Sequence, residues 1–116
     1  MRVLVCGGRD YRDRERVFAV LHALLVKSEG IDAIIEGGAR GADRLAREFA
    51  KAYSTRCLTY EADWDAHGSF AGPMRNKLML EDGQPDLVIA FPGGSGTRDM
   101  VRKARKAGVD VVEISP

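Results

Sequence analysis

A glycine-rich stretch near the end of this 116-residue chain carries the residues best suited to chemistry: Phe-Pro-Gly-Gly-Ser-Gly-Thr-Arg-Asp-Met over residues 91–100. It follows an apolar run and opens an amphipathic segment that ends near Gly108, which predicts a strand, a turn and a helix. Glycines have no Cβ to hold a ligand away, and the N–H groups at a helix start attract anions. The turn therefore predicts a phosphate site, formed by Pro92, Gly93, Gly94, Ser95, Gly96 and Thr97. It contains no lysine, which excludes the P-loop of nucleoside triphosphatases.

Two earlier glycine turns are expected at the same edge of the sheet. The run over residues 2–6 leads into Gly7-Gly8, and the run over residues 31–36 leads into Gly-Gly-Ala-Arg-Gly over residues 37–41. Ligands of open parallel sheets bind outside the carboxyl ends of the strands, so we expect Gly7, Gly8 and Gly38 to border a ligand. The alternative is that these are tight strand-to-helix turns with no ligand.

An arginine lies on or close to each loop that follows the first four strands. These residues are Arg9, Arg40, Arg75 and Arg98. Guanidinium groups bind phosphate through two parallel hydrogen bonds, so their convergence would form a cationic ligand pocket. The alternative is that they cover solvated helix faces, as expected for Arg102 and Arg105.

Acidic and aromatic residues are expected at the same edge. Asp99 falls in the first turn of the last helix, where it is either a catalytic carboxylate or an acid favoured by the helix dipole. Asp63 and Trp64 fall in a long connection, and Trp64 either stacks on a base or packs against the protein. Glu36 ends the second strand, where doubly wound folds bind ribose, although its spacing from Gly8 is longer than the dinucleotide fingerprint requires.

Five apolar runs alternate with four amphipathic segments. The runs are continuous in Val, Ile and Leu, which indicates strands buried on both faces, and right-handed crossovers then give a parallel sheet. We expect a single Rossmann-like α/β domain over residues 1–116, with three layers, helices on both faces and strand order 3-2-1-4-5. Predicted strands cover residues 2–6, 31–36, 55–61, 87–91 and 109–114. The first helix is expected to start near Asp13 with its stop at Gly30, and a third helix to start at Pro73. Residues 62–72 are expected to be irregular.

Composition restricts the partners. Eighteen Lys and Arg stand against 17 Asp and Glu, so there is no basic excess to favour nucleic acid or a membrane surface. The chain enters a strand at once and has no long apolar span, which predicts a cytoplasmic protein. Cys6 and Cys57 lack metal or redox spacing, so we expect no metal and no disulfide. We also expect no cofactor.

The motifs together resemble the SLOG superfamily, which includes the LOG-type nucleoside 5′-monophosphate phosphoribohydrolases and DNA-processing protein A. They are Cys6-Gly7-Gly8, the turn over residues 37–41, Arg75-Asn76-Lys-Leu-Met79 and Pro-Gly-Gly-Ser-Gly-Thr over residues 92–97. Gly-Gly-Arg-Asp-Tyr, Ala-Asp-Trp and Ala-Gly-Pro-x-Arg-Asn resemble the small stand-alone proteins related to YspA and YpsA. The resemblance implies a nucleotide-like ligand, adds Asn76 to its expected contacts and implies a homodimer.

The LOG enzymes use an arginine and a glutamate for N-glycosidic cleavage. By resemblance the arginine falls on Arg75, but the glutamate falls on Met100, whose thioether cannot activate water. Asp99 lies one residue earlier, roughly 100° round the helix, and with Arg75 it is the candidate catalytic pair of an enzyme. Asp63 or Asp65 could supply the carboxylate instead, with Arg75 orienting the phosphate. The leading hypothesis is therefore a nucleotide-binding sensor or carrier, and the alternative is a LOG-like phosphoribohydrolase. A single-strand nucleic-acid binder is disfavoured by the balanced charge.

Overall fold

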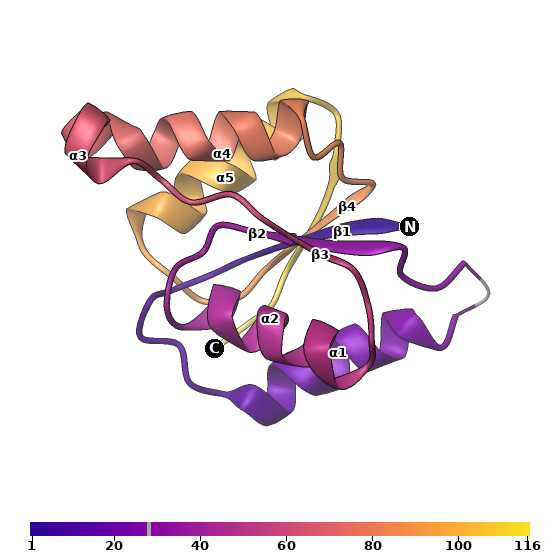
Figure 1. Ribbon diagram of the computed structural model, residues 1–116. Helices are drawn as coiled ribbons and strands as arrows, with labels where there is room; N and C mark the ends of the chain where they lie inside the picture. The colour runs from indigo at the N-terminus through magenta and orange to yellow at the C-terminus, as the bar shows by residue number, and fades with distance from the viewer. Residues whose placement is uncertain (28) are drawn as a thin grey trace.

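The computed structural model describes residues 1–27 and 29–116, which form one layered α/β unit. The elements in chain order are β1 (Arg2–Cys6), α1 (Arg14–Leu25), β2 (Ala33–Glu36), α2 (Ala42–Ala52), β3 (Cys57–Thr59), α3 (Trp64–His67), the 3₁₀ turn η1 (Gly68–Phe70), α4 (Ala71–Glu81), β4 (Leu87–Ala90), α5 (Ser95–Lys106) and β5 (Asp110–Glu113). All strand pairs are parallel, and the order β3-β2-β1-β4-β5 confirms the prediction. Helices α1 and α2 lie on one side of the sheet, and α3, α4 and α5 lie on the other (Figure 1).

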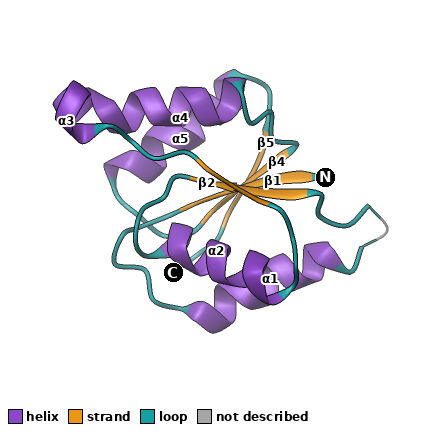
Figure 2. Cartoon of the chain, in the orientation of Figure 1, coloured by secondary structure: helices purple, strands orange, loops and turns teal. Residues whose placement is uncertain are grey.

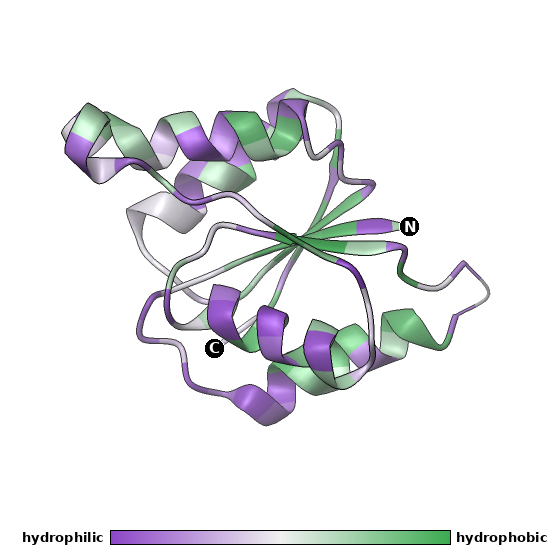
Figure 3. Cartoon of the chain, viewed as in Figure 1, coloured by the Kyte–Doolittle hydropathy of each residue, from purple (hydrophilic) through white to green (hydrophobic). Residues whose placement is uncertain are grey.

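The apolar core forms two layers, one on each face of the sheet. Val3 and Val5 of β1 pack in the layer under α1 and α2, whereas Leu4 and Cys6 pack in the layer under α4 and α5. Successive strand residues point to opposite faces, so burial on both sides requires the unbroken apolar runs seen in the sequence. Figure 3 shows the hydrophobic strands in the centre of the molecule, flanked by helices in which hydrophobic and hydrophilic residues are mixed.

Close contacts join the three glycine turns at the carboxyl edge of the sheet. The Gly8 amide donates to the Pro92 carbonyl at 2.9 Å, and the Gly8 carbonyl accepts from the Ala42 amide at 3.1 Å. Gly41 has φ +79°, and a side chain there would overlap the Gly8 carbonyl oxygen. A methyl group on Gly93 would lie 2.6 Å from the Gly8 nitrogen. The glycines therefore allow three backbone segments to approach within hydrogen-bonding distance.

The structure corrects several of the predicted boundaries. Residues 62–72 are not irregular, because α3 and η1 lie within them and α4 begins at Ala71, two residues before Pro73 (Figure 2). Asp63 caps α3 by accepting from the Ala66 amide at 3.1 Å, and Gly68 ends it at φ +54°. A four-residue helix is too short to produce a hydrophobic period. The first helix ends at Leu25 and not at Gly30, and the third strand covers only Cys57–Thr59.

Candidate functional site

A cavity of about 760 Å³ opens at the carboxyl edge of the sheet, where the turns after β1 and β4 meet α4. A second cavity of about 360 Å³ adjoins it and shares four of its residues, Arg9, Ala39, Trp64 and Arg75. The larger cavity is within the size range of small-molecule sites. Its lining includes most of the residues predicted to bind a ligand: Gly7, Gly8, Arg9, Trp64, Arg75, Asn76, Gly94, Ser95, Gly96 and Thr97.

The start of α5 presents free amide groups to this cavity. Its first backbone bond runs from the Arg98 amide to the Gly94 carbonyl at 3.1 Å. Among the described residues, no acceptor pairs with the amides of Ser95, Gly96 or Thr97, as expected for the first turn of a helix. A Cβ on Gly94 or Gly96 would meet no atom within 4 Å. The positive end of α5 is therefore open to an anion.

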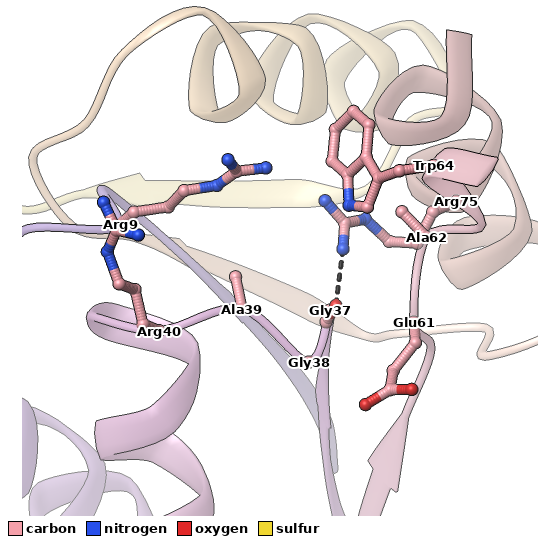
Figure 4. A pocket seen from close by; sticks show the side chains of 9 residues that line it. All are labelled: Arg9, Gly37, Gly38, Ala39, Arg40, Glu61, Ala62, Trp64 and Arg75. Carbon is pink, nitrogen blue, oxygen red and sulfur yellow. Dashed lines mark hydrogen bonds between the residues drawn. The ribbon is translucent and has the colours of Figure 1, made fainter. Parts of the chain in front are cut away.

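Arg9 and Arg75 supply positive charge to both cavities. Arg75 is half-buried on α4, where its guanidinium donates to the Gly37 carbonyl and to Asn76 Oδ1, the latter at 3.0 Å. Burial lowers the pKa of Arg75, but an arginine stays charged at neutral pH. Arg9 lies 5.1 Å from the centre of the Trp64 ring, a cation–π distance. Figure 4 shows the Arg9 and Arg75 side chains extending into the space beside Trp64, while the Glu61 carboxylate points away.

The predicted convergence of four arginines is wrong for Arg98. It is exposed and lines neither cavity, because it lies about 100° further round α5 than Thr97. Arg40 lines only the smaller cavity and forms an exposed ion pair with Asp10 at 3.3 Å. Arg102, which the sequence placed on a solvated face, lines the larger cavity.

Other predicted ligand-binding residues have different positions. Gly38 lines only the smaller cavity, and Asp63, Pro92 and Gly93 line neither. Asp63 instead caps α3, while Pro92 and Gly93 hold the turn after β4 against Gly8.

Asp99 lines the larger cavity, but its carboxylate is already paired. It accepts from Asn76 Nδ2 at 3.0 Å, from Arg102 at 2.6 Å and from Lys103 Nζ at 2.7 Å. Burial opposes ionisation, but the hydrogen bonds from Lys103 and Asn76 outweigh it and hold the pKa of Asp99 below its ordinary value. Asp99 is therefore a stable anion near neutral pH and a poor proton donor.

Glu36 is unavailable to a ligand. Its side chain is fully buried, pairs with Arg47 at 2.7 Å, and accepts from the Gly38 amide at 2.7 Å and from the Thr59 hydroxyl. These contacts join β2 to α2 and β3 and satisfy the carboxylate within the protein.

Asp43 is a site residue that the sequence reasoning missed. It lies in the first turn of α2, is only 7% exposed and lines the larger cavity. Its Oδ2 atom accepts from the amides of Gly37 and Ala39 at 3.2 and 3.3 Å. Burial, reinforced by the nearby charge of Glu36, raises the pKa of Asp43 to about 6. The signal in the sequence was an acid two residues after Gly41, at the start of a helix that points at the predicted ligand edge.

Among residues 1–27 and 29–116, no group of three or more His, Cys, Asp or Glu residues is arranged to hold a metal ion. Within the same part of the chain, no helix has the length and apolar character needed to cross a membrane.

Solved structures share the fold at low sequence identity. DNA processing protein A from Streptococcus pneumoniae superimposes with a TM-score of 0.80 and 20% identity over 99% of this chain, which spans half the length of that protein. The structural-genomics target TM1055 gives a TM-score of 0.76 and 18% identity over 95% of this chain and 71% of its own. UDP-GlcNAc 2-epimerase from Neisseria meningitidis, bound to UDP-GlcNAc, gives a TM-score of 0.66 and 16% identity. The match covers 98% of this chain and 32% of the epimerase chain.

Sequence comparisons identify the family. The Gene 61 protein of Mycobacterium phage D29 is 38% identical over an alignment 118 residues long, which covers 96% of this chain and 94% of the phage protein. The model of the YspA, cpYpsA-related SLOG family matches residues 1–67, a segment that contains Arg9, Asp43 and Trp64 but neither Arg75 nor the α5 turn. The chain therefore belongs to the YspA, cpYpsA-related SLOG family.

Proposed function

We propose that this protein is a cytoplasmic domain that binds a nucleotide or a nucleotide-derived small molecule and acts as a sensor or carrier. The observation that carries the proposal is the larger cavity, which places the free amides of residues 95–97 and the cations of Arg9 and Arg75 around one space. Oriented amides and guanidinium groups together form strong charge-assisted bonds to phosphate.

The remainder of the cavity suits the organic part of such a ligand. A single phosphate fills a small part of about 760 Å³. Trp64 is 47% exposed at the cavity wall, so part of its ring is free to contact a base. Stacking of a base on an aromatic ring contributes roughly 1–3 kcal/mol to nucleic-acid binding, and the same contact is available here.

Binding is favoured over LOG-like hydrolysis by two side chains. Met100, at the position of the LOG glutamate, is fully buried in the apolar layer under α4 and α5 and does not line the cavity. Asp99, the alternative carboxylate, is held by Asn76, Arg102 and Lys103. Neither residue is in a position to activate water as the LOG glutamate does.

Trp64 makes the proposal directly testable because it is the only tryptophan of the chain. We expect its fluorescence to change on titration with a panel of nucleoside 5′-monophosphates. Arg75→Ala should weaken binding at least tenfold, since hydrogen bonds to charged groups contribute about 1.5–3 kcal/mol. Arg98→Ala, which removes an exposed arginine outside both cavities, should leave the affinity unchanged.

Proton NMR on the same samples separates binding from turnover. Ligand broadening with no free base supports a binding domain, and Arg75-dependent release of free base would establish the hydrolase alternative instead. If no member of the panel changes the fluorescence or the ligand spectrum, the proposed function is wrong. Far-UV circular dichroism of both variants controls for loss of fold.

We also propose that the protein forms a homodimer. Phe70, Met74 and Leu78 follow one another at four-residue spacing along η1 and α4, and all three are exposed. Such a stripe on a helix is suited to packing against a second copy. Sedimentation velocity over a concentration series should show a dimer that Leu78→Glu dissociates; a wild-type monomer at every concentration would refute it.

A further inference from the structure

Helices α2 and α5 both begin at the larger cavity, and their first turns present different chemistry to it. At α5 the amides of residues 95–97 are open. At α2 the Ala42 amide is taken by the Gly8 carbonyl at 3.1 Å, and the side chain that faces the cavity is Asp43. The cavity therefore has open amides at the α5 end and, when Asp43 is ionised, a carboxylate with the Arg75 guanidinium nearby at the α2 end.

One oxygen of Asp43 is available to a ligand. Both turn amides reach Oδ2, and among the described residues no hydrogen bond reaches Oδ1. No fully buried side-chain oxygen of the described residues lacks a partner, so Oδ1 keeps accessible surface although Asp43 is 7% exposed. The described residues form no ion pair with Asp43 either. A buried carboxylate oxygen that faces a cavity without a partner is a strong acceptor for a donor on a ligand.

The distance between the starts of α2 and α5 indicates which group of the ligand donates to Asp43. β1 alone separates β2 from β4, and α2 and α5 lie on opposite faces of the sheet, so the starts of these two helices are at least two strand spacings apart, roughly 10 Å or more. A pentose 5-phosphate with a hydrogen bond at each end spans this gap, since each bond adds about 3 Å. An inorganic phosphate is too short, and a second phosphate would meet the Asp43 charge.

We propose that Asp43 accepts hydrogen bonds from the sugar hydroxyls of the ligand, so that the cavity recognises a ribose 5-phosphate unit with its phosphate at α5. The inference rests on the proposed function and specifies its ligand class. Glu36 at the end of β2, the position that binds ribose in dinucleotide folds, is occupied by Arg47, Gly38 and Thr59. Asp43 takes the role because its Oδ1 is the acidic oxygen left open to the cavity at this end.

The proposal is tested by removing the sugar hydroxyls from the ligand and the carboxylate from the protein, separately and together. Isothermal titration calorimetry at pH 7.5 compares the four common ribonucleoside 5′-monophosphates with their 2′,3′-dideoxy analogues, on wild type and on Asp43→Asn. Wild type should bind the preferred ribonucleotide at least tenfold more tightly than its dideoxy analogue, since a charged acceptor is lost with the hydroxyls. Asp43→Asn should bind the two alike, because its amide keeps the turn contacts but lacks the charge. Asp65→Asn, at an exposed acid outside both cavities, is the matched control and should keep the preference.

The outcomes distinguish the two proposals. Tight binding by wild type with no preference for the hydroxyls overturns the role of Asp43 and leaves the nucleotide site standing; this comparison needs no variant. Binding with a preference that survives in folded Asp43→Asn has the same meaning. Failure of wild type to bind any ribonucleotide or analogue refutes the nucleotide site, and the ribose inference with it.

Discussion

Gly93 and Gly96 lie three residues apart in the same turn, yet alanine should have opposite effects at the two positions. Gly96 is exposed in the first turn of α5, and an added Cβ meets no atom within 4 Å. Gly96→Ala should therefore stabilise the protein by about 0.5 kcal/mol, because alanine loses less backbone entropy in a helix than glycine. An added Cβ at Gly93 meets the Thr97 hydroxyl and lies 2.6 Å from the Gly8 nitrogen and 3.0 Å from the Gly7 carbonyl carbon. Gly93→Ala should cost about 3 kcal/mol, the upper end for overpacking, because backbone atoms cannot give way.

The same pair separates stability from binding. Gly96 lines the larger cavity, so its new methyl group occupies space that we assign to the phosphate. We expect Gly96→Ala to raise the urea midpoint by about 0.3 M and to weaken nucleotide binding at least tenfold. Urea unfolding by circular dichroism and titration by Trp64 fluorescence give both numbers on one sample. Unchanged affinity in Gly96→Ala would refute the phosphate site at α5, and wild-type stability of Gly93→Ala would refute the close approach of the turns.

Two further predictions concern buried acids. Arg47→Met should destabilise the protein by about 2–3 kcal/mol in urea unfolding, because it leaves the fully buried Glu36 without its cation. Arg44→Met, at an exposed arginine of the same helix, is the control. Equal stability of the two variants would contradict the role of Arg47 as the partner of Glu36. Because burial raises the pKa of Asp43 from 3.8 to about 6, the ionised form is disfavoured in the folded state, and stability is lost as pH rises from about 4 to about 6. The free energy of unfolding of Asp43→Asn should therefore match that of wild type below pH 4 and exceed it by about 3 kcal/mol above pH 6. Urea unfolding across this pH range measures the difference. A difference that does not change with pH would show that titration of Asp43 is not its cause.

The expected gain in Asp43→Asn is relevant to function. A residue whose ionisation is expected to destabilise the protein at neutral pH, and which lines the larger cavity, has the pattern common to binding and catalytic sites. The stability measurement is independent of any ligand, so it tests the environment of Asp43 even before the ligand is known.

The sequence by itself determined the sheet and the place of the site. Unbroken apolar runs require strands covered on both faces, and the glycine turns after β1, β2 and β4 mark where backbone segments approach closely. Strand order and the ligand edge follow from the handedness of parallel crossovers. The glycine turn after β4, Arg9 and Arg75 were identifiable on these grounds as residues of that edge.

Only the tertiary structure decided which polar groups are free. Glu36, Asp43 and Asp99 occupy comparable positions at the ends of strands and starts of helices, but their partners differ. Arg47 neutralises Glu36, and Lys103 and Arg102 hold Asp99. Asp43 lines the larger cavity, and one of its oxygens has no hydrogen-bond partner among the described residues. The ionisation and availability of a carboxylate depend on its burial and on charges and donors that the fold brings within a few ångströms. Residue spacing along the chain does not contain that information.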